Sequence, residues 1–171
     1  MPPNNPQPTI EPATRDDLET VTDLWVRLAR DQRQHDSAVR ADPNRETIRE
    51  TLAAYQVADG LLVARLAGEI VGFASVTIER GSLELDSTRG LLSNIYVEPA
   101  FRDRGIGAAL LTAAEEAAAE RGADEVLLEV MADNEAARRF YRREGYDEFR
   151  VTMSRSLENR DENDTHSKED G

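Results

Sequence analysis

The sequence predicts an α/β domain with a mixed, mostly antiparallel central sheet flanked by helices. Strand-like and helix-like segments alternate along the chain without forming a regular βαβ series. Two strand-like runs, 61–66 and 70–79, are separated by a tight Ala-Gly-Glu turn, which predicts a β-hairpin and argues against a wholly parallel sheet. Further along, a turn with two glycines joins a buried strand to an amphipathic helix. These observations favour helices packed on a mixed sheet.

Composition narrows the class of protein. The chain has 171 residues with 39% hydrophobic content, which fits one globular domain. It has no cysteine, so disulfides, thiolate zinc sites and a cysteine nucleophile are excluded. Only His35 and His166 could offer an imidazole, and they lie far apart, so we expect no metal site. No apolar run is long enough for a membrane span and no signal-peptide pattern opens the chain, so we expect a cytoplasmic protein without membrane contact.

The charge is strongly acidic. The net charge of −13 argues against nucleic acid as a partner. Lys168 is the only lysine, and 34 carboxylates face 21 basic residues. Steering of a cationic substrate and adaptation to a high-salt cytoplasm both explain this pattern, and a GC-rich genome alone would also favour arginine over lysine. The acidity runs through the whole chain, which favours salt adaptation.

The elements can be taken in order. Residues 1–8 form a flexible, proline-rich lead. Thr14 is placed to cap a helix that keeps an apolar face to about residue 31. The region 32–45 is polar, and a second helix covers 46–57. Two further helices are predicted at 108–120 and 134–144, and the tail 155–171 reads as disordered. Strands are predicted at 9–13, 61–66, 70–79, 91–97, 125–131 and 146–154, with a seventh, partly extended piece at 82–85.

The segment from residue 91 to 121 organises the chain. A β-branched, apolar strand ends before Pro99, and Arg102-Asp103-Arg104-Gly105-Ile106-Gly107 then leads into a helix from about Ala108. A strand, a glycine turn and a helix N-terminus direct free backbone N–H groups at an anion, and arginines add charged donors. The segment lacks the lysine of a Walker loop, and Leu110 stands where a dinucleotide fingerprint has glycine or alanine. It therefore predicts a phosphate cradle of another kind.

Two motifs carry a family resemblance. Arg102-x-x-Gly105-x-Gly107, preceded by Asn94-Ile-Tyr-Val-Glu-Pro, resembles the acetyl-CoA pyrophosphate loop of the GNAT superfamily of N-acyltransferases. Some 30 residues on, Leu128-Glu129-Val130-Met131-Ala132-Asp133-Asn134 is followed by a helix with Phe140-Tyr141 and then Gly145-Tyr146, which resembles the end of such domains. The resemblance covers about residues 9–154. It implies the GNAT fold, with six to seven strands, about four helices, and a V-shaped splay between strands 91–97 and 125–131.

The resemblance also implies site residues. The strand that matches Asn94 to Val97 is bulged in the family and offers main-chain groups to the pantetheine and the thioester carbonyl. Asn134 either caps its helix or contacts the pantetheine arm. The residues implied in acetyl-CoA binding are Ile95, Tyr96, Val97, Arg102, Asp103, Arg104, Gly105, Ile106, Gly107, Ala108, Asn134 and Tyr141.

Two side chains are candidates for catalysis. Tyr141 matches a tyrosine near the cofactor sulfur, where a phenol can donate a proton to the departing thiolate. Packing of its ring in the core is the alternative. Glu129 matches a glutamate that acts as a base through water in N-terminal acetyltransferases, although in other members it is structural. A base is needed because free amines are largely protonated at neutral pH.

These residues predict an acetyl-CoA-dependent N-acetyltransferase in which a primary amine attacks the thioester directly in a ternary complex. The alternative is a non-catalytic domain that binds acetyl-CoA as a sensor or regulatory module. The acceptor stays open between a protein N-terminus, a polyamine, an amino acid and an aminoglycoside-like amine. Homodimers are common in the family, but no motif here specifies one.

Overall fold

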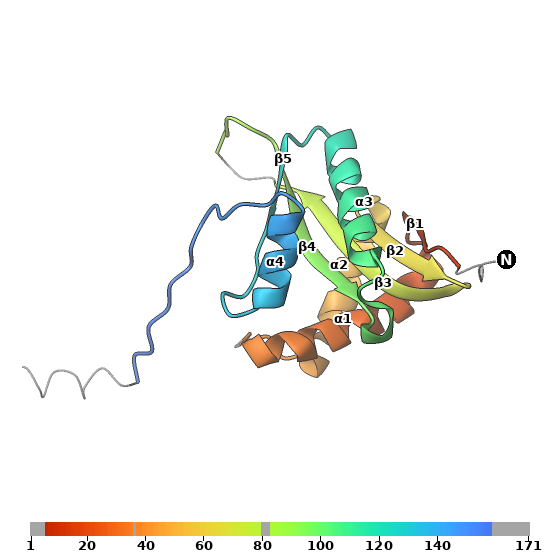
Figure 1. Ribbon diagram of the computed structural model, residues 1–171, viewed down its shortest axis with the longest axis horizontal. Helices are drawn as coiled ribbons and strands as arrows, with labels where there is room; N and C mark the ends of the chain where they lie inside the picture. The colour runs from red at the N-terminus through yellow and green to blue at the C-terminus, as the bar shows by residue number, and fades with distance from the viewer. Residues whose placement is uncertain (1–5, 36, 80–82, 159–171) are drawn as a thin grey trace, which may run out of the picture. The chain divides into compact units, whose positions relative to one another are not determined.

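The computed structural model describes residues 6–35, 37–79 and 83–158, and the chain divides into two compact units, Met1–Arg138 and Arg139–Gly171. The first unit holds the sheet and most of the helices (Figure 1). Its strands are β1 (Thr9–Pro12), β2 (Leu61–Leu66), β3 (Glu69–Ile78), β4 (Arg89–Val97) and β5 (Glu125–Leu128). The α-helices are α1 (Leu18–Gln32), α2 (Arg45–Val57), α3 (Ile106–Glu120) and α4 (Glu135–Arg143).

The sheet is mixed and follows the order β1-β2-β3-β4-β5. The pairs β1–β2, β2–β3 and β3–β4 are antiparallel, whereas β4–β5 is parallel. The β2–β3 hairpin turns at Ala67 and Gly68, which have φ of 51° and 83°. A mirror-image turn of this kind matches the twist of the two strands. The predicted α/β class, the hairpin and the mixed sheet are confirmed.

A β-bulge interrupts β4 at Ser93. Ser75 pairs with Asn94 and the next residue, Val76, pairs with Leu92, so Ser93 is the extra residue. Because side chains alternate between the two faces of a strand, one extra residue reverses which face the following side chains occupy. Asn94 donates from Nδ2 to the buried Ser75 hydroxyl at 2.8 Å, which satisfies both polar groups beside the bulge.

The parallel ladder between β4 and β5 is short. It joins residues 89–92 to residues 125–128 and ends at the pair Leu92–Leu128. From Ser93 to Val97, β4 continues along β3 but has no partner on its other side within the described residues. The pairing of β4 with β5 therefore ends immediately before the bulge.

Helices cover both faces of this sheet. On one face, α1 and α2 pack into an apolar cluster with Leu61, Val63, Phe73 and Tyr96. On the other face, α3 lies against β3 and β4, as Figure 1 shows. Its buried residues are Ile106, Leu110, Leu111, Ala114 and Ala118.

Two glycines let α3 approach the sheet closely. A Cβ on Gly90 of β4 would lie 2.8 Å from Ala118 Cβ, and one on Gly72 of β3 would lie 3.2 Å from Leu110 Cδ1 and 2.7 Å from the Tyr96 carbonyl oxygen. Contacts under 3.0 Å are too short for carbon atoms, so a side chain at either position would push its neighbour away. The positions of Leu110 and Ala118 along α3 are therefore set by contacts at two separate strands.

A charged cluster fixes the start of α1. The Asp17 carboxylate accepts hydrogen bonds from the Thr14 backbone N–H at 2.8 Å, the Thr14 hydroxyl at 3.1 Å and Arg65 Nη2 at 2.6 Å. Burial alone would raise the pKa of Asp17, but the hydrogen bonds from Arg65 and Thr14 outweigh it and hold the pKa below its usual value. Arg65 also pairs with Glu11 on the neighbouring strand. Thr14 is the N-cap of a short 3-10 helix, Arg15–Asp17, that leads into α1, whereas the N-cap of α1 itself is Asp17, so the predicted cap lies one turn before the α-helix.

Several predicted bounds need correction. Within the described residues the sheet has five strands instead of six to seven. β5 ends at Leu128 instead of residue 131 because its ladder with β4 stops there. Residues 146–154 form no strand: Phe149, Val151 and Met153 alternate as a strand face should, but they are 57%, 76% and 88% exposed and pair with no ladder. The 82–85 piece is also wrong where it is described, because residues 83–85 are not extended in a ladder.

Other predictions fall partly or wholly outside the described residues. Residues 1–5 of the predicted lead and 159–171 of the predicted tail are not described, and residues 6–8 carry no regular structure. Within the described ranges, no helix is both long enough and apolar enough to cross a membrane.

Candidate functional site

The turn before α3 has the backbone geometry of an anion cradle. Asp103 and Gly105 both have positive φ, 62° and 80°. Gly105 is the N-cap of α3, and its carbonyl accepts the first helical bond, from Ala109 N–H at 3.1 Å. The N–H groups of Ile106, Gly107 and Ala108 therefore have no acceptor within the helix. The helix begins two residues earlier than predicted, so that Gly107 lies in its first turn.

Glycine at the mouth of the cradle leaves the backbone accessible. A Cβ built on Gly105 would have no atom within 4 Å, so open space lies beside it. Ile106, in contrast, is only 2% exposed, and its side chain is part of the core. Of the predicted cradle residues, Ile106 can thus offer only its main chain to a ligand.

The two arginines of the cradle already have contacts. Arg102 donates from Nε to the Val97 carbonyl at 2.9 Å, and its Nη2 lies 3.5 Å from Asp31 Oδ2 at the end of α1. Its guanidinium also lies 5.5 Å from the centre of the Tyr96 ring. Arg104 lies 5.5 Å from the centre of the Phe101 ring. Arg102 therefore anchors the turn to β4 and α1, while the N–H groups of Arg104 have no acceptor among the described residues.

The bulged part of β4 presents main-chain groups toward the open side of the sheet. Glu98 N–H donates to Val71 C=O at 2.8 Å, which directs the main-chain groups of residue 98 toward β3. Main-chain N–H and C=O groups alternate in direction along a strand. Those of Tyr96 therefore also face β3. Those of Ile95 and Val97 face the opposite edge of β4, beyond the end of β5. The Val97 carbonyl is taken by Arg102, which leaves the N–H of Ile95 and Val97 and the Ile95 carbonyl.

The Tyr96 side chain serves the core. It is 5% exposed and belongs to the apolar cluster beneath α1 and α2. Burial, together with the charges of Glu98 and Asp31, raises the pKa of its phenol. Three residues of β4 are predicted to bind acetyl-CoA. Tyr96 is the one whose main-chain groups and side chain both point away from the edge of β4 that has no partner strand.

Asn134 and Glu129 lie after β5. Asn134 Oδ1 accepts a hydrogen bond from Ala137 N–H at 3.2 Å, so this side chain caps α4. That oxygen is occupied, and the side-chain amide remains as a donor. Glu129 directly follows the last residue of β5 and is exposed. Asp133, the residue before Asn134, has its Oδ1 3.3 Å from Nδ1 of His35, which lies in the short 3-10 helix Arg33–His35 that follows α1.

Tyr141 belongs to the second unit. Its ring lies 5.2 Å from that of Phe140 and 5.9 Å from that of Tyr146, centre to centre. The Tyr141 carbonyl accepts from Tyr146 N–H at 2.9 Å, which closes the end of α4 at Gly145. Burial raises the pKa of the Tyr141 phenol to about 12, so the hydroxyl keeps its proton at neutral pH.

Sequence reasoning missed the groups that hold this site in place. The Asn94–Ser75 bond beside the bulge joins two strands, and the Arg102–Asp31 contact joins residues 71 positions apart. Asp31 and Ser75 stand in ordinary helix and strand patterns, so no local signal marks them. Only the pairing of the strands brings them to the site.

The sheet, its bulge and the cradle are those of a known family of acetyl-group-transferring proteins. The chain matches the acetyltransferase (GNAT) family over residues 19–146. It belongs to this family.

Named relatives agree with that membership. An uncharacterized N-acetyltransferase of Methanocaldococcus jannaschii is 38% identical over 93 residues, which cover 54% of this chain and 41% of that protein. The N-alpha-acetyltransferase of Sulfurisphaera tokodaii is 36% identical over 108 residues, which cover 60% of this chain and 64% of that protein. The chain thus spans less than two thirds of the length of these relatives.

Solved structures share the fold. A putative acetyl transferase from Pyrococcus furiosus is 25% identical with a TM-score of 0.68, and covers 88% of this chain and 100% of its own. The aminoglycoside N-acetyltransferase AAC(6')-Iy, solved in complex with CoA, is 22% identical with a TM-score of 0.71, and covers 92% of this chain and 99% of its own. At this identity the second likeness concerns the fold alone.

The residues of the cradle suit the pyrophosphate of a coenzyme A thioester. Three first-turn N–H groups, the positive end of the α3 dipole and the Arg104 guanidinium are donors for phosphate oxygens. The open space beside Gly105 admits such a group close to the backbone. The N–H groups of Ile95 and Val97 suit the carbonyl oxygens of the attached arm, and the Ile95 carbonyl suits its amide N–H groups.

Proposed function

We propose that this protein is an acetyl-CoA-dependent N-acetyltransferase that acts on a primary amine by direct attack in a ternary complex. The observation that carries the proposal is the open cradle at the N-terminus of α3 beside the unpaired part of β4. Acetyl-CoA, when bound, supplies an activated acetyl thioester to the amine. The residues of the chain hold this group in place, polarise its carbonyl, and accept the proton of the amine.

The main chain of β4 is proposed to stabilise developing negative charge. A backbone N–H held rigidly in a sheet loses nothing in reorganisation when an oxyanion forms beside it. Ile95 and Val97 have N–H groups on the open side, and their strand is fixed by β3 and by the Asn94–Ser75 bond. Side-chain identity at these two positions then matters less than the bulge itself.

Tyr141 is proposed to act as a hydrogen-bond donor to the departing sulfur. With a pKa of about 12, its phenol is a weaker acid than an ordinary thiol, whose pKa is about 8.5. At equilibrium the proton therefore rests on the tyrosine, and the hydroxyl stabilises the thiolate by donating a hydrogen bond. The same pKa keeps this donor intact over the whole range in which amines lose their protons.

Glu129 is proposed as the base that takes the amine proton through water. Its exposure after the end of β5 leaves the carboxylate in reach of solvent and of an incoming acceptor. A carboxylate can accept a proton relayed by a water molecule, which is what this role requires.

The class of acceptor is proposed from the relatives. The N-alpha-acetyltransferase name of the Sulfurisphaera tokodaii relative favours the α-amine of a peptide. The aminoglycoside N-acetyltransferase shares only the fold, so an aminoglycoside amine is the second candidate. Because both are cationic, the net charge of −13 favours their approach.

A turnover assay with acetyl-CoA and a panel of acceptors tests the proposal. The panel contains a short peptide with a free N-terminus, an aminoglycoside, spermidine and a free amino acid. We expect release of free CoA with the peptide, and rates that rise with pH up to about pH 10 without a falling limb. Coenzyme binding without turnover of any acceptor would favour the sensor alternative, and no binding by folded protein would contradict the whole proposal.

Two variants test the proposed roles. Tyr141→Phe removes only the hydroxyl, and we expect kcat to fall about 100-fold, as for loss of one preorganised donor. Tyr146→Phe removes a hydroxyl from the neighbouring ring of the same unit and serves as the matched control. Glu129→Gln should lower kcat at pH 7 and lose that defect at pH 9.5, where more of the amine is already neutral. An equal defect at both values contradicts the role of base.

A further inference from the structure

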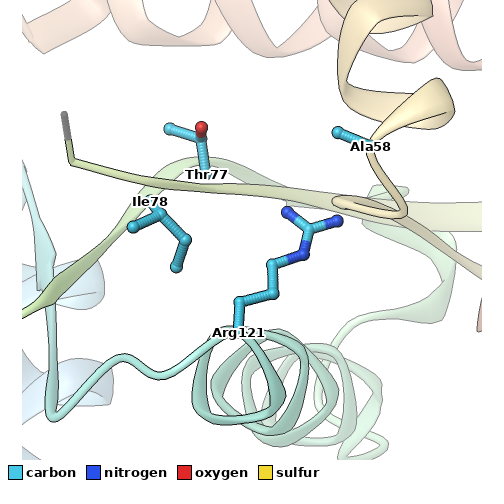
Figure 2. A pocket seen from close by; sticks show the side chains of 4 residues that line it. All are labelled: Ala58, Thr77, Ile78 and Arg121. Atoms are coloured by element: carbon cyan, nitrogen blue, oxygen red, sulfur yellow. The ribbon is translucent and has the colours of Figure 1, made fainter.

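A cavity lies at the C-terminal end of α3, the end opposite the cradle. It has a volume of about 340 Å³ and is lined by Ala58, Thr77, Ile78 and Arg121, all in the first unit (Figure 2). Arg121 is the C-cap of α3, whereas Gly105 is its N-cap. A helix of this length rises roughly 20 Å, so the cavity is remote from the phosphate cradle.

Arg121 brings one buried, unpartnered nitrogen of its guanidinium to this cavity. The side chain as a whole is half-buried, its Nη2 atom is buried without a hydrogen-bond partner, and no ion pair of this residue is found within the described part of the chain. Figure 2 shows the side chain directed from the end of α3 toward β3 and the end of α2. A guanidinium is always charged, and leaving its buried N–H group unpaired is unfavourable. An anion bound in the cavity would accept a hydrogen bond from this group.

A glycine makes room for this guanidinium. A Cβ on Gly60 would lie 3.4 Å from Arg121 Nη1 and 2.2 Å from the Val76 carbonyl oxygen. Glu79, the residue after β3, has its Oε2 3.8 Å from Arg89 Nη1, and this oxygen is buried without a hydrogen-bond partner within the described residues. Gly60 therefore leaves the space that the Arg121 guanidinium occupies beside the cavity.

The edge of β3 adds a main-chain donor. Val76 N–H donates to Gly60 C=O at 2.8 Å, on the side of β2, and Glu79 N–H donates to Arg89 C=O at 2.8 Å, on the side of β4. By alternation, Ile78 N–H points toward the β2 side, where β2 has not yet begun. The guanidinium and this N–H are donors for a carboxylate, and the walls of Ala58 and Ile78 are apolar.

We propose that this cavity binds a small organic monocarboxylate. Its oxygens accept hydrogen bonds from Arg121 Nη2 and Ile78 N–H, and its short apolar chain packs on Ile78 and Ala58. The cavity volume lies at the lower end of that of small-molecule sites, which suits a ligand of this size. The site is separate from the proposed coenzyme site and does not depend on the proposed activity.

The test compares isovalerate with isovaleramide, which has the same shape but no charge. Each is titrated into the full chain labelled with ¹⁵N, in the presence of saturating CoA so that the cradle is occupied. We expect isovalerate to shift the Arg121 Nε–H and Ile78 N–H signals in a saturable manner and isovaleramide to leave them in place. Equal shifts from both compounds, or none from isovalerate, would overturn the proposal.

Variants and salts complete the test. Arg121→Met keeps most of the side-chain length and should weaken isovalerate binding about tenfold or more, whereas Arg15→Met, at an exposed arginine of the first unit, should not. The wild-type comparison stands by itself if Arg121→Met does not fold. Sodium chloride that shifts the same signals at the same concentration as isovalerate contradicts an organic ligand, because the apolar walls would then contribute nothing.

Discussion

At the scale of single residues, Asp17 shows how one carboxylate joins three elements. It accepts from Thr14 before α1 and from Arg65 on β2, while Arg65 also pairs with Glu11 on β1. Because the side chain is buried and receives charge-assisted bonds, its ionised form contributes more to stability than an exposed carboxylate can. From the sequence alone, Asp17 is one of two adjacent aspartates after Thr14, where negative charge suits the start of a helix. The ion pair with Arg65 depends on the β1–β2 pairing and could not be read locally.

Replacing the Asp17 carboxylate should show how much it contributes to the free energy of unfolding and how that contribution depends on pH. We expect Asp17→Asn to lower the free energy of unfolding at pH 7 by about 1–3 kcal/mol. Since the folded-state pKa of Asp17 is lowered, its contribution is present above the unfolded value of 3.8 and is lost as the pH falls below it. Urea unfolding at pH 7 and at pH 3 measures this. The exposed neighbour Asp16→Asn is the control, and a constant difference between the two variants at both pH values would contradict the linkage.

At the scale of elements, the α3 N-terminus combines a structural requirement with a binding one. Gly105 has φ of 80° and open space beside it, so a side chain there meets backbone strain without a clash. Gly68 in the β2–β3 turn has nearly the same φ, 83°, and the same open surroundings. The two glycines differ in their place in the fold, since Gly105 caps α3 at the proposed cradle and Gly68 lies in a hairpin turn, which makes Gly68 a control for Gly105.

We expect Gly105→Ala and Gly68→Ala each to lower the free energy of unfolding by about 1 kcal/mol, because both force alanine into a left-handed conformation. Only Gly105→Ala should weaken CoA binding, since its methyl group enters the space beside the cradle. Calorimetric titration with CoA and thermal unfolding measure the two effects. Equal CoA affinity in both variants would mean that the ligand does not approach this turn.

At the scale of the whole molecule, charge is the dominant property. The chain carries a net charge of −13, so many carboxylates are left over beyond those in surface pairs such as Arg45–Asp23 and Arg30–Asp42. Such exposed pairs contribute little, whereas the repulsion among the excess carboxylates acts over the whole surface. Salt screens this repulsion, with a Debye length of about 10 Å at 0.1 M and about 3 Å at 1 M.

We therefore expect the melting temperature to rise when potassium chloride is increased from about 0.1 M to about 2 M. CoA affinity measured in the same solutions separates the two explanations of the acidity. Binding that is preserved or tighter at high salt supports salt adaptation. A melting temperature that falls with salt would show that the surface ion pairs outweigh the repulsion and would contradict that adaptation.

The sequence predicted the parts of the fold that local pattern decides. The hairpin of β2 and β3, the helix from residue 46 to 57 and the glycine turn before α3 follow from periodicity, glycine and proline, and these are confirmed, whereas phosphate binding at that turn stays a prediction. The bulge at Ser93 and the pairing of Arg102 with Asp31 are decided by contacts distant in the sequence. The alternation of Phe149, Val151 and Met153 has the period of a strand, but without a partner ladder that period forms none.

The two close contacts of α3 with the sheet restrict which substitutions the protein can accept without losing the geometry of the cradle. Leu110 packs on Gly72 and Ala118 packs on Gly90, so helix α3, whose N-terminus forms the cradle, is held against the sheet at two separate points. A larger residue at either glycine tilts or lifts the helix and moves its first-turn N–H groups, although neither glycine borders the cradle. Substitutions at positions 72, 90, 110 and 118 are therefore coupled, and a change at one strand can be accommodated only by a matching change on the helix.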